Sequence, residues 1–303
     1  MQENFLPPDD KIIEIGSIQT LSEIVDWGLV DFAAPELWKK NKGENTTVMI
    51  CDTGITDHED LKDNILQRRT RSLIPDESYI DGQGHGTAVA GVIAARESGF
   101  GIIGVAPKCQ IIPVKVLSNN GFLKSMSILE NALKYAKLIR PDVVNMSLGG
   151  RSKLSPLFHK LLKDLNRLNI PVVCAMGNSG DNFSCYPAEY EESIGVTSYK
   201  KERIISNFSS RSLNADFALP GENILTTSLN NNYSVVSGTS FSAPFLSGVI
   251  AIIISEFKKR NFKYTVKDIK DILINSCKDY GPVGKDKYYG YGIIDVNVLN
   301  NLL

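Results

Sequence analysis

Short apolar runs rich in β-branched residues alternate along the chain with longer segments in which an apolar residue recurs every three or four positions. The runs have no polar face, which is typical of strands buried on both sides of a sheet. They are Val48–Cys51, Ile111–Leu117, Val143–Met146, Val172–Ala175 and Ile194–Thr197. Strands that alternate with helices in this way predict a parallel sheet.

Two of the intervening segments carry apolar stripes at helical spacing. Ser127 and Glu130 are predicted to form a capping box at the start of the first helix. The first stripe consists of Met126, Leu129, Leu133, Ala136 and Ile139, and the second of Leu154, Leu157, Phe158, Leu161, Leu162, Leu165 and Leu168. We therefore predict an α/β fold of three layers, with helices flanking a mostly parallel central sheet. Functional residues in such sheets collect at the carboxyl ends of the strands.

Length and composition favour one large domain with a short extension. The chain has 303 residues, of which 43% are apolar, enough to fill the interior of a single α/β domain. Residues 21–303 contain no internal repeat and no long linker, so we expect one domain there. Residues 1–20 are expected to be an N-terminal extension, because Pro7 and Pro8 interrupt regular structure, although Lys11–Ile15 predicts a short strand.

Charge and hydropathy exclude two classes of partner. The chain has 33 basic and 34 acidic residues, so it has no basic excess for nucleic acid or an anionic membrane. The longest uninterrupted apolar run, Val249–Ile254, is too short to span a bilayer. The N-terminus lacks the features of a secretory signal, and five irregularly spaced cysteines predict free thiols in a reducing compartment. We expect a cytoplasmic protein, and the sequence leaves open whether it forms a homodimer.

The chain has only three histidines, which limits the choice of an imidazole base. His159 falls on an amphipathic helix, where a solvated position is expected. His58 lies in a polar loop, where a surface position is the commoner outcome and a metal ligand is the alternative. His85 lies between glycines in the segment Asp81–Thr87, and glycines on both sides let backbone and substrate approach closely.

Three further polar residues stand where a predicted strand ends or a helix begins. Asp52 directly follows a buried strand, where a carboxylate is costly unless it is paired, although a turn aspartate before Gly54 is the alternative. Ser240 precedes a long apolar helix, whose N-terminus favours negative charge, and both it and Ser242 are also candidate helix caps. Asn178 follows another buried strand, where its amide suits either an oxyanion or a turn.

These residues occur in the order Asp, His, Ser, which is the chain order in subtilisin. Over residues 21–303 the sequence resembles the subtilisin (subtilase) family and is closest in character to the intracellular subtilisins. The segments that carry the resemblance are 48–55, 58–61, 84–87, 145–150, 177–178, 219–225, 238–244 and 289–295.

The resemblance implies a subtilisin-like fold and a serine endopeptidase, a hydrolase that acts on polypeptide substrates through an acyl-enzyme. Ser240 would be the nucleophile and His85 its base, and Asp52 would orient the imidazole. Asn178 would hold the oxyanion together with the backbone N–H of Ser240. The catalytic triad would thus be Asp52, His85 and Ser240.

The family match also implies where substrate binds. An extended peptide would lie between two backbone edges, as an added strand. One edge is formed by Gly121, Phe122 and Leu123, the other by Ser147, Leu148 and Gly149, and the pocket for the residue before the cut is walled by Ala175, Met176 and Gly177. Cys185 is expected near the base of this pocket, which should accept apolar or medium-sized side chains.

Calcium is a further expectation from the family. Matching places Glu23, Asp60 and Ser98 near a structural calcium site, with carbonyl groups around Phe100 and Ile102 added to it. Two carboxylates suit a hard cation. Ser98 departs from the asparagine that is common at this position of the family.

The extension is expected to act as the inhibitory segment of a zymogen. Its sequence Phe5–Pro8 resembles the extension of intracellular subtilisins, which lies across the active site and is removed on activation. The main function expected is intracellular protein turnover or processing. A dedicated maturation protease for one partner or peptide leader is an alternative, and so is a non-catalytic peptide-binding protein on the same fold.

Two other classes are excluded by motif context. A metal-dependent hydrolase would need a metal-binding motif such as HExxH, which the chain lacks. The segment Gly99–Gly104 matches the dinucleotide fingerprint GxGxxG, but that motif requires a strand before it and a helix after it. Here a helix precedes it and a strand follows, so we predict a loop that binds no dinucleotide.

Overall fold

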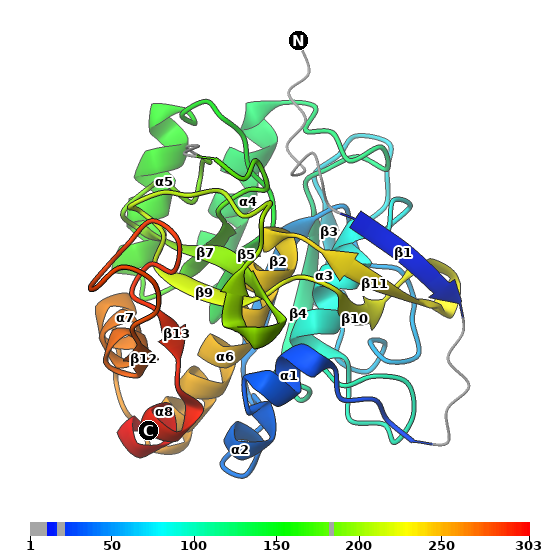
Figure 1. Cartoon of the computed structure of the whole chain (residues 1–303). Coiled ribbons are helices and arrows are strands. Elements are labelled where there is room, and N and C mark those ends of the chain that lie inside the picture. The colour runs from blue at the N-terminus through cyan, green and yellow to red at the C-terminus, as the bar shows by residue number, and fades with distance from the viewer. Residues whose placement is uncertain (1–10, 17–21, 182–184) are drawn as a thin grey trace.

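The computed structural model describes residues 11–16, 22–181 and 185–303, and it confirms the layered α/β architecture (Figure 1). The central sheet of the described residues has eight strands in the order β3-β4-β2-β5-β6-β7-β8, with β9 paired to β7. Its strands are β2 (Thr47–Asp52), β3 (Arg71–Ser72), β4 (Gln110–Lys115), β5 (Val143–Met146), β6 (Val172–Ala175), β7 (Ser193–Lys200), β8 (Ile204–Ile205) and β9 (Phe217–Pro220). All pairs are parallel except β7 with β8. Each of the five predicted strands is therefore present.

The sheet is apolar on both faces because helices cover both. Successive side chains of a strand point to opposite faces, so Val48 and Ile50 of β2 join one hydrophobic cluster while Met49 and Cys51 join the other. The first cluster contains side chains of α3 and α6, and the second contains those of α4 and α5. The helices of the described chain are α1 (Trp27–Asp31), α2 (Ala34–Trp38), α3 (His85–Ala94), α4 (Met126–Ile139), α5 (Pro156–Arg167), α6 (Thr239–Lys259), α7 (Val266–Asn275) and α8 (Val296–Leu302).

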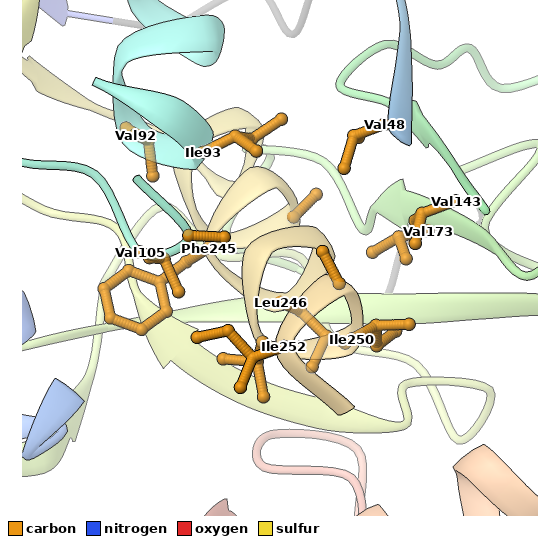
Figure 2. Close-up of a cluster of buried hydrophobic side chains, with 14 of the residues drawn as sticks. Val48, Val92, Ile93, Val105, Val143, Val173, Phe245, Leu246, Ile250 and Ile252 are labelled. Atoms are coloured by element: carbon orange, nitrogen blue, oxygen red, sulfur yellow. The ribbon is translucent and has the colours of Figure 1, made fainter. Parts of the chain in front are cut away.

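Helix α6 is the centre of the larger cluster. Figure 2 shows Leu246 and Ile250 of this helix facing Val48, Val143 and Val173 from three neighbouring strands. Among the described helices α6 alone has the length and composition of a membrane span, and its apolar window is completely buried. The burial explains why the helix is apolar all round, as expected for the core helix of a large domain.

The start of α4 corrects one prediction. Ser125 caps this helix, and its hydroxyl accepts the Ser127 N–H at 3.3 Å. Ser127 is already helical, and the Glu130 carboxylate accepts a hydrogen bond from Ser155 at the start of α5. The predicted capping box is therefore wrong, because the chain enters the helix two residues earlier than the Ser-x-x-Glu pattern suggests.

A second, antiparallel sheet lies beside α3. Its order is β1-β11-β10, formed by β1 (Lys11–Gly16), β10 (Ile224–Thr227) and β11 (Tyr233–Ser237). The predicted strand in the N-terminal extension is thus confirmed as β1. A two-stranded sheet of β12 (Cys277–Lys278) and β13 (Ile293–Ile294) completes the strands.

The order of the central strands marks where a site should lie. From β2 the chain passes through α3 to β4 on one side, and then through α4 to β5 on the other side of β2. Strand β2 is therefore the point at which the strand order reverses, and open α/β sheets bind ligands at the carboxyl ends of strands beside such a point. The residue at the carboxyl end of β2 is Asp52.

Candidate active site

A buried carboxylate–imidazole pair lies at the carboxyl end of β2. The Nδ1 of His85, the first residue of α3, is 2.8 Å from Oδ1 of Asp52. Asp52 is completely buried and His85 is 1% exposed. The same Asp52 oxygen accepts the N–H of Thr53 at 2.7 Å. Because the aspartate is held as an acceptor, the tautomer assigned to His85 has its proton on Nδ1, which leaves Nε2 as the basic nitrogen.

The loop before α3 explains why His85 faces Asp52. Asp81 accepts hydrogen bonds from the backbone N–H groups of Gln83, Gly84 and Thr87 at 2.9 Å each, which fixes the entry into the helix. Gly84 has φ +105°, a left-handed conformation that favours glycine. A Cβ atom at Gly86 would lie 2.1 Å from the Gly54 carbonyl oxygen, so only glycine permits this close approach to β2.

Ser240 lies in the first turn of α6, where backbone N–H groups have no partner within the helix. The side chain is completely buried, and its hydroxyl lies 3.4 Å from the Ser147 carbonyl oxygen. The neighbouring Phe241 ring packs against the His85 imidazole with 5.6 Å between ring centroids. The structure thus brings the first turn of α6 beside the pair, with the Ser240 hydroxyl turned toward Ser147.

Asn178 follows β6 and is fixed by the residue before Ser240. Its Oδ1 accepts hydrogen bonds from the N–H and the hydroxyl of Thr239, at 2.9 and 2.8 Å. The Thr239 hydroxyl in turn accepts the Gly177 N–H at 3.0 Å. Since Oδ1 accepts these hydrogen bonds, the orientation of the amide is fixed, with the nitrogen of Asn178 as its donor end. Sequence reasoning selected Asn178 but missed Thr239, whose only signal is its place beside Ser240.

The loops predicted to hold substrate follow β4, β5 and β6, so all three leave the sheet at the same edge. Gly121 lies in a tight turn with φ +76°, in which the Ser118 N–H donates to the Phe122 carbonyl. Between the other two loops lies the side chain of Cys185. A Cβ atom at Gly149 would lie 2.4 Å from its Sγ, and one at Gly177 would lie 3.3 Å from it.

The structure therefore places Cys185 against Gly177 of the predicted pocket wall and against Gly149 of the second predicted substrate edge. Its side chain is buried, and this burial, followed by the nearby Glu189 carboxylate, raises the pKa of the Cys185 thiol to about 12. The thiol is thus protonated at neutral pH and acts as a packing group. All five cysteines are free, as predicted.

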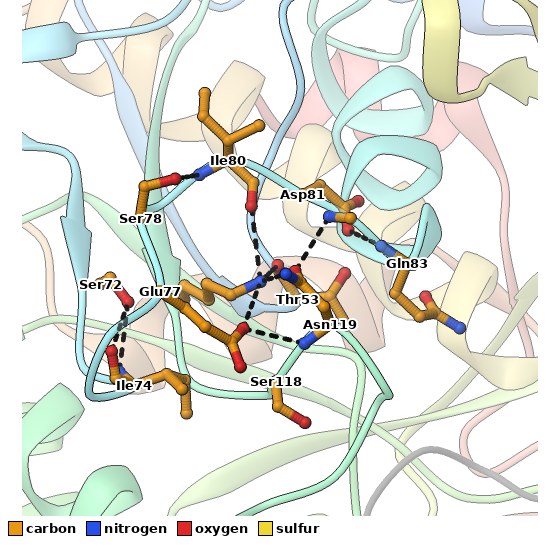
Figure 3. A network of polar contacts seen from close by, with 12 residues as sticks. Thr53, Ser72, Ile74, Glu77, Ser78, Ile80, Asp81, Gln83, Ser118 and Asn119 are labelled. Carbon is orange, nitrogen blue, oxygen red and sulfur yellow. Dashed lines mark hydrogen bonds and ion pairs between the residues drawn. The ribbon is translucent and has the colours of Figure 1, made fainter.

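A buried lysine supports the loop after Asp52, and sequence reasoning missed it. Lys115 pairs with Asp52 in the β2–β4 register and is completely buried. Its ammonium donates to the Thr53 carbonyl and, at 2.8 Å, to Asn119 Oδ1, and it lies 3.4 Å from Glu77. Figure 3 shows Thr53, Glu77 and Asn119 converging in this network. One cation therefore ties the loop after Asp52 to the loop that begins the first predicted substrate edge. The sequence feature that could have identified Lys115 is a lysine within the apolar predicted strand Ile111–Leu117.

The three residues predicted to bind calcium lie together. The Glu23 carboxylate accepts the Ser98 N–H at 2.8 Å, and the Ser98 hydroxyl lies 3.3 Å from Oδ1 of Asp60 and 2.9 Å from the Phe100 carbonyl oxygen. Asp60 is completely buried, and its other oxygen accepts hydrogen bonds from Tyr233 and Ile102. No group of three or more His, Cys, Asp or Glu side chains suited to a metal occurs in residues 11–16, 22–181 and 185–303. The oxygen-rich donor set fits a hard cation that takes carbonyl and hydroxyl ligands as well as carboxylates.

The other two histidines have structural positions. His58 was predicted at the surface, which is wrong, because it is 1% exposed and packs against the Tyr233 ring. Its Nε2 is assigned as donor to the Asn232 carbonyl at 2.9 Å, and its Nδ1 as acceptor of the Asp60 N–H at 3.1 Å. Burial lowers the pKa of His58, which favours the neutral ring. The two hydrogen bonds occupy both of its nitrogens. His159 is partly exposed and bonds Glu192 at 2.9 Å.

The glycine-rich segment Gly99–Gly104 lies after α3 and before β4, as predicted. It therefore lacks the strand–loop–helix context that a dinucleotide site requires. The predicted inhibitory segment Phe5–Pro8 lies outside the described residues.

The chain is similar to one protein family and to several named proteases. A family described as "Subtilase family" matches residues 43–292. The chain is 38% identical over 246 residues to the "Major intracellular serine protease" of Bacillus subtilis (strain 168), with 78% of this chain and 76% of that protein covered. It is 36% identical over 285 residues to the "Intracellular serine protease" of Paenibacillus polymyxa, with 91% and 86% covered. The "Minor extracellular protease Epr" of Bacillus subtilis (strain 168) is 32% identical over 94% of this chain, which spans 43% of that relative's length.

Proposed function

The chain belongs to the subtilase family, and on this premise we propose that it is a serine endopeptidase that cleaves polypeptides through Asp52, His85 and Ser240. The observation that carries the proposal is the buried hydrogen bond between Asp52 and His85 Nδ1, placed beside Ser240 in the first turn of α6. A charged carboxylate in the interior is costly unless it is paired, and here its partner is the imidazole that the reaction needs.

In the proposed reaction the Ser240 hydroxyl turns from the Ser147 carbonyl toward His85 and attacks the scissile carbonyl carbon. Nε2 of His85 takes the hydroxyl proton and later donates it to the leaving amine. Asp52 stabilises the imidazolium that forms between these two steps. The resulting acyl-enzyme is hydrolysed by water, which His85 activates in the same way.

Two donors suit the negative charge that develops on the substrate oxygen. One is the backbone N–H of Ser240, which has no partner within α6, and the other is the side-chain amide of Asn178. The Thr239 contacts hold the Asn178 amide in place before substrate binds. Such preorganised donors lower the barrier because they need no rearrangement during the reaction.

The substrate-binding part of the proposal rests on the loops after β4, β5 and β6. We place the peptide between residues 121–123 and residues 147–149, and the side chain before the cut between Gly149 and Gly177. Sγ of Cys185 lies against both glycines and would form the base of this pocket, which favours apolar side chains of medium size. The sulfur is neutral, so it offers no counter-charge for lysine or arginine.

The direct test uses an unfolded protein substrate and a fluorophosphonate probe, with calcium supplied. We expect casein to be cleaved, and mass spectrometry of the labelled protein to find the probe on Ser240. A folded protein that binds peptides but neither cleaves casein nor reacts with the probe would favour the peptide-binding alternative.

We place this activity inside the cell, in protein turnover or processing. Two relatives named intracellular serine proteases support this location, while another relative is named extracellular. A library of peptides separates the two roles. Cleavage at many sites is expected for turnover, whereas a single preferred motif would indicate a maturation protease.

We also propose that the residues before β1 inhibit the enzyme until they are removed. Strand β1 runs antiparallel to β11, with Lys11 opposite Ser237, three positions before Ser240. The chain that precedes Lys11 therefore joins β1 at the end nearest the nucleophile. An attached segment acts at a high effective concentration, so even a weak contact with the active site blocks it.

Removal of residues 1–10, which leaves β1 in place, is expected to raise the rate of fluorophosphonate labelling on the order of tenfold. A peptide of residues 1–10 added to the shortened protein should restore inhibition, whereas a scrambled peptide should not. Removal of residues 1–17 serves as a second variant that also takes away β1. Equal labelling rates for the full and both shortened chains would rule out an inhibitory extension.

Calcium completes the proposal as a structural ion. Glu23, Asp60 and Ser98, with carbonyl groups of Phe100 and Ile102, would hold it, and it would stabilise the loop between α3 and β4. An ion that binds only the folded state stabilises it by about 2.7 kcal/mol at a hundredfold excess over its Kd.

Saturating calcium is therefore expected to raise the melting temperature by about 5 °C over that in chelator. Asp60→Asn should remove this increase, while Asp57→Asn, an exposed aspartate in the same loop, should keep it. An unchanged melting temperature in calcium and chelator would show that these side chains serve only as loop contacts.

A further inference from the structure

Helix α6 contains a proline four residues after the proposed nucleophile. In an α-helix the carbonyl of residue i accepts the N–H of residue i+4, and Pro244 has no N–H to offer to the carbonyl of Ser240. Both residues are buried, so water does not readily replace the missing donor. A buried carbonyl without a donor would be costly at the point where the nucleophile must be held still.

The side chain of Ser147 supplies the missing donor from outside the helix. Ser147 directly follows β5, and its Oγ lies 2.7 Å from the Ser240 carbonyl oxygen in the first turn of α6. Ser147 is also completely buried. The contact replaces the helical hydrogen bond that Pro244 removes.

Two further side chains fix the direction of this hydrogen bond. Nδ2 of Asn145 donates to Ser147 Oγ at 3.0 Å, and the Ser247 hydroxyl lies 3.0 Å from Asn145 Oδ1. Because Ser147 Oγ accepts from Asn145, its single proton is left to point at the Ser240 carbonyl. This chain of hydrogen bonds begins at Ser247 and ends at Ser240, both on α6, and passes through Asn145 of β5. It therefore ties the first turn of α6 to the central sheet.

We propose that Ser147 is a positioning residue that holds the backbone of Ser240 in place of the hydrogen bond removed by Pro244. This role rests on the proposed function and goes beyond the place of Ser147 on the substrate edge, because it is carried by the hydroxyl and not by the backbone. The substitution Ser147→Ala leaves the backbone edge intact and removes only the donor. The double variant Ser147→Ala/Pro244→Ala gives residue 244 an N–H with which to restore the helical bond.

The experiment compares kcat, KM and fluorophosphonate labelling of five proteins: wild type, Ser147→Ala, Pro244→Ala, the double variant, and Ser242→Ala. Loss of one buried hydrogen bond at the nucleophile should lower kcat about tenfold in Ser147→Ala, with KM within about twofold of wild type. The double variant should regain kcat to within about threefold of Pro244→Ala. Ser242→Ala removes another buried hydroxyl from the same turn, one that contacts the Leu219 carbonyl, and should leave kcat within about twofold of wild type.

The outcomes separate the positioning role from a general loss of stability. If Ser147→Ala keeps wild-type kcat, or if the double variant is as slow as Ser147→Ala, the proposal fails. Should Ser147→Ala not fold, Ser147→Cys keeps a weaker donor and should lower kcat by less than about tenfold from wild type, while an unchanged kcat in Ser147→Cys would contradict the proposal. Wild-type protein that does not label at Ser240 would instead overturn the proposed function, which is a different result.

Discussion

Replacement of Ser240 by alanine is expected to abolish peptide hydrolysis and fluorophosphonate labelling while leaving a folded protein that still binds peptides. The loss in kcat should approach the value of about 2 × 10⁶ known from subtilisin itself, where the serine and the histidine act as one unit. The physical reason is that no acyl-enzyme forms without the hydroxyl, and the remaining groups act on water alone.

His85→Ala should cost about as much, and the double variant should be no slower than either single one. This non-additivity is the signature of residues that work in one step. Ser242→Ala is the matched control, because it removes a buried serine hydroxyl two positions away in the same helix. Residual hydrolysis above about a thousandth of the wild-type rate in purified Ser240→Ala would show that another group is the nucleophile.

The architecture could be predicted because the sheet is buried on both faces. Runs such as Val143–Met146 have no polar side, and strands of this kind need helices above and below them. Strands β10 and β11 were not predicted, because Thr226, Thr227 and Ser234 interrupt their apolar pattern. These hydroxyl residues are buried, and Thr226 and Thr227 donate to carbonyl groups at the start of α3. Their burial depends on a tertiary contact that local periodicity does not contain.

The proposed catalytic residues could be selected for a similar reason. Each lies at an element boundary that a local pattern marks, a buried strand before Asp52, glycines around His85 and a long apolar helix after Ser240. The groups that hold them could not be found in this way. Lys115 meets Glu77 and Thr53 only when three loops fold together. His58 was misplaced for the same reason, since the loop that buries it is distant in sequence.

The positions of these supporting groups share one principle. A neighbouring group orients two of the proposed catalytic side chains through one of their polar atoms. Asp52 accepts the hydrogen bond of His85 Nδ1, which makes Nε2 the basic nitrogen, and Thr239 donates to Oδ1 of Asn178, which fixes the direction of the amide nitrogen. Such preorganisation lowers the barrier because the groups do not need to reorient when charge develops.

Asn178→Ala is therefore expected to lower kcat by about 10²–10³, the loss known for the oxyanion asparagine of subtilisin itself, with little change in KM. The amide nitrogen would meet a full negative charge only in the transition state, so its removal affects the chemical step more than substrate binding. The measurement is steady-state hydrolysis of a peptide, with kcat and KM determined separately. Asn178→Asp is the control of similar size, and it should be at least as slow because an acceptor then faces the oxyanion.

Thr239→Val tests whether the orientation of this amide matters as well as its presence. The valine side chain removes the 2.8 Å contact from the hydroxyl but keeps the backbone N–H contact to Asn178 Oδ1. We expect a smaller loss in kcat, about tenfold, in the wild-type background, and no further loss when Asn178 is already alanine, because Thr239 would then have nothing left to orient. If the two losses instead multiply, Thr239 acts on Ser240 directly through the start of α6. An Asn178→Ala protein with near wild-type kcat would leave the Ser240 N–H as the main oxyanion donor.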